Sequence, residues 1–181
     1  MNHNSLQRIS RIARAALLAA LCASGQDHKW AGRTLDGFEW TIHETLAGLP
    51  AYSVFDTVRF EVQGKNVALS GQVVDASLKE SAELTLRQIN GVESVANNIE
   101  VLPASRSDAA LRMNVYRAIY EKHALEKYGT RTTAPIHIIV KNGWVGLEGV
   151  VDSDSDRNSA HQQALKVTAH VSDNLRVAPA E

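Results

Sequence analysis

The sequence predicts an α+β fold made of two copies of one small module, each with helices packed on one face of a three-stranded mixed sheet. Three observations lead to this prediction. Apolar positions repeat 78 residues apart, in step with Gly71 and Gly149. Each copy contains two runs that alternate apolar and polar residues around a short turn, which is the pattern of a β-hairpin. Each hairpin lies between two stretches with the three- and four-residue spacing of amphipathic helices.

The repeat continues without a gap from the hairpin through the helix that follows it. The matched positions are Val58/Ile136, Phe60/Ile138, Val62/Val140, Val67/Val145, Leu69/Leu147, Val73/Val151, Ala82/Ala160, Leu86/Ala164 and Ile89/Val167. Beyond them the second copy is two residues shorter, so that Ile99 and Val101 match Leu175 and Val177. Gly91 has no counterpart in the second copy.

The repeat defines the expected domains. The first covers residues 35–102, a linker covers 103–107, and the second domain covers 108–178. Domains of this length bury a modest fraction of their surface and are marginally stable alone. We therefore expect the two domains to pack together.

In the first copy, the helical spacing of apolar residues begins at Leu35 and ends before Pro50, which stops the helix. The runs VRFEV and VALSGQV then alternate on either side of the turn QGKN. A second helix is predicted over residues 78–90, and a short final strand ends at Val101.

The second copy repeats this order with the runs IHIIV and VGLEGVV. Its hairpin turn contains Asn142 and Gly143, residue types that accept the positive φ angles of tight turns. A helix over residues 154–168 and a strand ending at Val177 complete the copy. The helix at its start is predicted to be continuous from Ser107 to Gly129.

That first helix of the second copy has two apolar stripes, about 120° apart around its axis. One stripe should cover the sheet and consists of Leu111, Val115, Ala118 and Ile119. The other consists of Ala109, Met113, Tyr116, Tyr120 and Ala124. One sheet cannot bury both. The second stripe either docks on the first domain or meets a membrane surface or the groove of another protein.

Residues 1–25 are interpreted as an export signal. Arg8, Arg11 and Arg14 precede the apolar run AALLAALCA and then small residues, with no acidic residue in the segment. The run is shorter than the roughly 20 apolar residues of a membrane span. We expect export to the periplasm or cell envelope, with 26–34 as a linker. An organellar transit peptide shares the arginine-rich start and is the minor alternative.

Cys22 is the only cysteine and lies inside this segment. Leu21 stands directly before it, where a lipidated cysteine normally follows a small residue, so we do not expect a lipid anchor at Cys22. The net charge of −1 includes the three arginines of the segment, and the rest of the chain is more acidic. Because nucleic-acid binding depends on basic surfaces, we expect no nucleic-acid partner.

The hairpin glycines, Ala82 and Ala160 in the following helices, and the ending GV…V-x-N-x-I-x-V from Gly91 to Val101 resemble the BON domain. The resemblance covers about residues 35–178 in two copies, and the second copy departs from it where Gly-Val should recur. It implies the fold described above, with Gly71, Gly91 and Gly149 as structural glycines. It also implies an exported bacterial envelope protein linked to osmotic stress, anionic phospholipid binding and envelope integrity.

Sequence patterns for metal binding and catalysis are missing. The three acids Asp152, Asp154 and Asp156 alternate as in an EF-hand loop, but the sixth and twelfth positions hold Arg157 and Gln163 in place of Gly and Glu. We interpret the acids as groups at the start of a helix. The seven histidines show neither zinc-helix spacing nor a catalytic motif, and we expect them to be solvated. We expect no enzyme, no cofactor and no metal.

The helix from Ser107 to Gly129 is the candidate binding element because it is net basic in an acidic protein. The residues expected to contact a lipid or protein partner are Arg112, Met113, Tyr116, Arg117, Tyr120, Lys122, Lys127 and Arg131. Our hypothesis is binding to anionic phospholipid or an envelope component, with each cation contributing about 1 kcal/mol near an anionic surface. Trp144 at the hairpin tip is a further interfacial candidate. The alternative is a periplasmic chaperone or protein-interaction module without lipid affinity.

Overall fold

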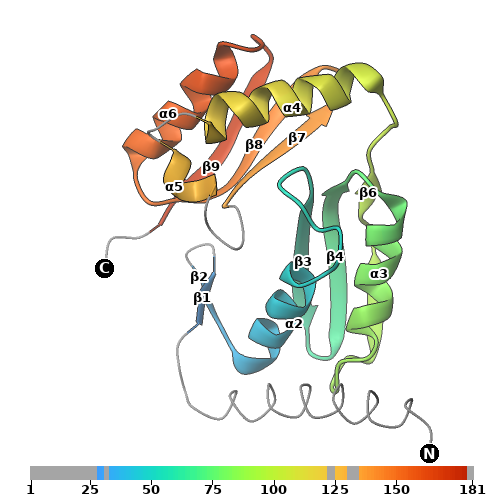
Figure 1. The fold of residues 1–181 in the computed structure, drawn as a ribbon. Helices are drawn as coiled ribbons and strands as arrows, with labels where there is room; N and C mark the ends of the chain where they lie inside the picture. Colours follow the sequence, from blue (N-terminus) through green and yellow to red (C-terminus); the bar gives the residue numbers. More distant parts are fainter. Residues whose placement is uncertain (1–27, 31–32, 122–124, 130–134, 179–181) are drawn as a thin grey trace, which may run out of the picture.

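The computed structural model describes residues 28–30, 33–121, 125–129 and 135–178. Figure 1 shows two α+β modules that follow one another along the chain. The predicted α+β class, with two modules that each contain a mixed sheet, is confirmed. Among the described helices, none combines the length and the apolar character needed to cross a bilayer.

The first module consists of a small hairpin followed by a mixed sheet and two helices. Its elements are β1 (His28–Trp30), β2 (Arg33–Leu35), α2 (Gly37–Ala47), β3 (Thr57–Gln63), β4 (Asn66–Val73), α3 (Ala76–Leu86), β5 (Ser94–Asn97) and β6 (Glu100–Val101). Strand β4 pairs antiparallel with β3 and parallel with both β5 and β6, which form one interrupted third strand. Apolar residues of β3 and β4 pack against α2 and α3 in a buried core that includes Ile42, Leu69 and Leu86.

The second module repeats this architecture. Its elements are α4 (Arg106–Tyr120), α5 (Glu126–Gly129), β7 (Ile136–Lys141), β8 (Trp144–Val151), α6 (Asp154–Leu165) and β9 (Val171–Val177). Strand β8 is central, antiparallel to β7 and parallel to β9. Figure 1 shows α4 and α6 beside each other on one face of this sheet. Strand β7 is an edge strand of this sheet, and α4 packs against it.

The repeated glycines Gly71 and Gly149 have the same structural role in the two modules. Their φ angles are 116° and 120°, in the region that disfavours L side chains. A Cβ atom on Gly71 would overlap the carbonyl oxygen of Thr57, and one on Gly149 would overlap that of Pro135. Only glycine permits the two hairpin strands to approach this closely.

The continuous helix predicted from Ser107 to Gly129 is wrong. Helix α4 ends at Tyr120, and a short helix, α5, begins at Glu126. A straight continuation would advance about 1.5 Å per residue along the same axis. The change of direction instead brings Leu125 and Tyr128, at 1% and 0% exposed, into the core of the second module.

Two smaller differences lie in the first module. The third strand is divided at residues 98–99, where the Asn97 side chain accepts a hydrogen bond from the Ile99 N–H at 3.2 Å. The segment 26–34, expected to be a linker, contains β1 and part of β2, which pair antiparallel.

Candidate functional site

Polar side chains on the inner side of α4 bind the outer edge of β7. Ser105 caps the helix by accepting a hydrogen bond from the Asp108 N–H at 3.2 Å. The Asp108 carboxylate accepts hydrogen bonds from the N–H groups of Asn142 and Gly143, both at 2.9 Å. The start of α4 is thereby fixed to the β7–β8 turn.

Arg112 is buried one turn further along the helix, with 5% of its surface exposed. Its Nη2 donates to the Val140 carbonyl oxygen at 2.9 Å, and its Nε has no hydrogen-bond partner among the described residues. Burial lowers the pKa of Arg112, while the charges of Asp108 and Asp56 oppose this. The guanidinium of this predicted binding residue therefore faces the interior of the protein.

Tyr120 is also buried, at 6% exposed, and holds the other end of β7. Its hydroxyl donates to the Ile136 carbonyl oxygen at 2.5 Å and accepts from the Ile136 N–H at 3.2 Å. Burial raises the pKa of Tyr120 above its ordinary value, so the phenol stays neutral. Together with Asp108 and Arg112, it satisfies polar groups of a strand edge that would otherwise be open to pairing with another strand.

Tyr116, in the second apolar stripe, contacts the first module. Its ring lies 6.0 Å from the ring of Phe55, in an edge-on arrangement, and 5.0 Å from the ring of Tyr120. Phe55 belongs to the loop before β3 and packs against the core of the second module. At this residue, therefore, the stripe meets the other module, which is one of the three arrangements that the sequence left open.

The outer face of α4 is formed by Arg106, Ala110, Met113 and Arg117. On a helical wheel the last two lie within about 20° of Arg106, on the opposite side from Val115, which is buried. Both arginines are exposed, and Met113 has 39% of its surface exposed. Of the predicted binding residues, Met113 and Arg117 thus lie together on an exposed surface.

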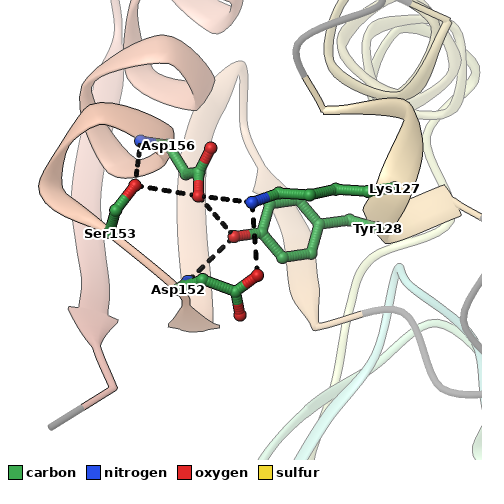
Figure 2. A network of polar contacts seen from close by, with 5 residues as sticks. All are labelled: Lys127, Tyr128, Asp152, Ser153 and Asp156. Atoms are coloured by element: carbon green, nitrogen blue, oxygen red, sulfur yellow. Dashed lines mark hydrogen bonds and ion pairs between the residues drawn. The ribbon is translucent and has the colours of Figure 1, made fainter. Parts of the chain in front are cut away.

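Lys127 lies away from that face, in the polar network of Figure 2. Its Nζ lies 2.8 Å from Asp156 and 3.2 Å from Asp152. The buried Tyr128 hydroxyl donates to Asp156 at 2.8 Å and accepts from the Asp152 N–H at 2.8 Å. The hydrogen bond with Asp156 raises the pKa of Lys127 above its ordinary value. This network ties α5 to the start of α6.

Of the alternating acids, Asp154 and Asp156 lie in the first turn of α6, and Asp152 and Asp156 pair with Lys127. Ser153 caps α6 by accepting a hydrogen bond from the Asp156 N–H at 3.1 Å. Arg157, at the sixth position of the EF-hand-like run, donates to Asp173 at 2.9 Å. Within the described part of the chain, there is no group of three or more His, Cys, Asp or Glu that could hold a metal ion.

Lys122 and Arg131, the remaining predicted binding residues, lie outside the described residues.

The loop from Pro50 to Asp56 joins the two modules along the edge of β7. The Ile138 N–H donates to the carbonyl oxygen of Val54 at 2.7 Å, so the loop adds a backbone hydrogen bond to the strand edge. The Tyr52 ring lies 5.7 Å from the ring of His137. The sequence predicted a solvated side chain at His137, and the structure shows a half-buried one. We call this loop together with β7 the module seam.

Two ion pairs flank the module seam. Arg59 of β3 lies 2.6 Å from Glu148 of β8, and Lys141 of β7 lies 2.5 Å from Glu100 of β6. Each pair joins one module to the other. Sequence reasoning missed the seam because the loop, YSVFD, has no periodicity that would mark it as a contact surface.

Comparison with known families gives a match to the BON domain over residues 47–103 and 107–179. These two segments include most of the chain, and the protein belongs to the BON-domain family. The tandem arrangement and the resemblance found in the sequence are confirmed. No curated protein matches the chain.

Two solved structures with similarity to the chain are of CdsD, a structural protein of the type III secretion system of Chlamydia trachomatis. Its C-terminal domain has 13% sequence identity and a TM-score of 0.30, with 75% of this chain and 62% of that chain covered. The second has 13% identity and a TM-score of 0.28, with 77% of this chain and 91% of that chain covered.

Proposed function

We propose that this protein is an exported, non-enzymatic tandem BON module that binds anionic phospholipid at the membrane surface and contributes to envelope integrity or stress tolerance. The proposed contact is the outer face of α4. One observation carries the proposal: Arg106 and Arg117 stand on either side of the exposed Met113, and no ion pair involves either arginine in the described part of the chain. Cationic groups beside an apolar side chain suit the boundary between lipid headgroups and acyl chains.

The expected interaction is weak and peripheral. Two cations near an anionic surface contribute about 2 kcal/mol together, which is roughly a 30-fold change in affinity. Such an attraction between exposed charges weakens as salt increases. Membership of the BON family and the predicted export signal support a place in the cell envelope.

A second candidate is a protein-interaction module without lipid affinity. The contact between Phe55 and Tyr116 favours it, because an aromatic side chain from the other module already occupies part of the α4 surface. Aromatic anchors of this kind are common at the centres of protein interfaces.

Co-sedimentation with vesicles separates these two candidates. The protein is mixed with vesicles of phosphatidylglycerol and phosphatidylcholine, or of phosphatidylcholine alone, at low and high salt. The proposal predicts sedimentation only with the anionic vesicles, and less at high salt. Equal and negligible sedimentation in all four mixtures would remove lipid binding and leave the protein-interaction candidate.

A further inference from the structure

The module seam contains a titratable side chain, His137, in surroundings that disfavour its charged form. Its Nδ1 atom is buried and has no hydrogen-bond partner in the described part of the chain. The adjacent residue, Ile138, makes the backbone hydrogen bond to Val54 of the other module. A change at His137 therefore acts directly on the contact between the modules.

Charged and titratable groups face His137 from each element around it. The Pro50–Asp56 loop contributes Tyr52 and the Asp56 carboxylate, and β8 contributes Glu148 directly across the ladder. Glu148 is already paired with Arg59 of β3. Asp56 accepts three hydrogen bonds, from the N–H and hydroxyl of Ser53 and the N–H of Val74, and it lies near the charge of Arg112. Both carboxylates are therefore already engaged in other contacts, and their charges favour a charged imidazole without outweighing its burial.

These surroundings determine the direction in which His137 responds to pH. Burial lowers the pKa of His137 below the ordinary 6.5, while hydrogen bonds to the backbone of Asp56 and Ser53 and the charges of Glu148 and Asp56 oppose this. Burial raises the pKa of Tyr52 to about 12, so Tyr52 stays neutral throughout. The pKa of His137 is therefore lower when the modules are docked than when they are apart. Docking is favoured in full above pH 6.5, and it weakens as the pH falls from 6.5 through the lower pKa of the docked state.

We propose that protonation of His137 opens the module seam, so that the two modules separate as the surroundings become acidic while each remains folded. Protonation places a charge on a ring whose buried Nδ1 has no hydrogen-bond partner in the described part of the chain, and this cost is relieved when the loop withdraws from β7. Phe55 then leaves Tyr116, and this ring joins Met113 on the accessible surface of α4. This last consequence rests on the proposed function, whereas the opening itself does not.

Hydrogen exchange at the Ile138 amide tests the opening without any lipid. Exchange of the full chain is followed by NMR at about pH 7.5 and about pH 5.5, on either side of the ordinary histidine pKa, and corrected for the intrinsic rates. The amides of β4 and β8 report whether each module stays folded. We expect protection of Ile138 to fall between the two pH values by up to about tenfold, because pH 5.5 lies about one unit below the ordinary histidine pKa, with β4 and β8 unchanged.

Two variants and one titration make the result specific. In His137→Gln, the amide of Ile138 should exchange at the same corrected rate at both pH values. His170→Gln is the matched control, because His170 is exposed and stacks on Trp144 outside the seam, and it should respond like the unmodified chain. The ring-proton titration of His137 in the unmodified chain should give a midpoint below 6.5.

The proposal is overturned if Ile138 is equally protected at both pH values, if His137→Gln loses protection as the unmodified chain does, or if His137 titrates at 6.5 or above. Loss of protection in β4 and β8 together with Ile138 would also overturn it, because that result indicates unfolding. Vesicle binding is measured separately. A seam that opens without increased vesicle binding would contradict the added contribution of Tyr116 to lipid binding and leave the switch intact.

Discussion

At the scale of single residues, Gly149 occupies a position that no other residue type can adopt without strain. Gly149→Ala should lower the free energy of unfolding by about 3 kcal/mol, because it combines an unfavourable φ of 120° with overlap on the Pro135 carbonyl. Gly146→Ala in the same strand is the control, since its Cβ would come no closer than 3.8 Å to a neighbour. Urea unfolding of both variants checks this, and equal losses would contradict the account.

Arg112 and Arg117 have similar sequence surroundings and opposite structural roles. Arg112→Met should cost about 2 kcal/mol of unfolding free energy, because the buried Val140 carbonyl loses its partner. Arg117→Met changes an exposed position and should stay within about 0.5 kcal/mol. The same urea measurement compares them, and a stable Arg112 variant would show that the guanidinium does not support the β7 edge.

The sequence separates these two arginines only in part. On a helical wheel, Arg112 lies about 60° from the buried Val115 and Arg117 about 160° from it, so the wheel places Arg112 nearer the core. Charged side chains are rarely buried, however. Nothing in the local sequence indicates that a carbonyl oxygen of β7 needs a hydrogen-bond donor from α4. That information depends on how α4 aligns with β7, where Val140 lies 28 residues after Arg112 in the chain.

At the scale of elements, α5 is held to α6 by the network around Tyr128. Tyr128→Phe should lower the free energy of unfolding by about 1–2 kcal/mol, because the Asp152 N–H and the Asp156 carboxylate both lose a hydrogen-bond partner. Tyr116→Phe removes a hydroxyl from a half-buried ring that makes ring contacts, and should change stability by less than about 0.5 kcal/mol. Thermal unfolding in parallel distinguishes them; a larger effect at Tyr116 would contradict this assignment.

Most helices and strands follow from periodicity and turn residues, as in the hairpin around Asn142 and Gly143. The break between α4 and α5 does not, because the helical pattern continues through it while buried contacts of Tyr128 decide the change of direction. The acidic run before α6 shows the opposite case. Its place at the start of a helix was predicted, and Ser153 does cap that helix.

At the scale of the whole molecule, the duplication could be predicted because glycine and apolar positions recur at a fixed interval. The module seam could not. Its hydrogen bond between Val54 and Ile138 and its ring contact between Phe55 and Tyr116 join segments that carry no complementary pattern in the sequence. Because Phe55 of the loop also contacts Tyr116 of α4, the apolar stripe is divided between an internal contact and an exposed face.

The most direct measurement is binding to phosphatidylglycerol-containing vesicles by two charge-reversal variants with equal net charge. Arg106→Glu with Arg117→Glu should reduce the affinity by about 30-fold or more, because both cations of the α4 outer face become acids. Lys65→Glu with Lys166→Glu, at exposed positions in the β3–β4 turn and directly after α6, should bind much more strongly than the Arg106 and Arg117 variant. Equal binding by the two variants, with both proteins folded, would contradict the claim that this face of α4 contacts the membrane.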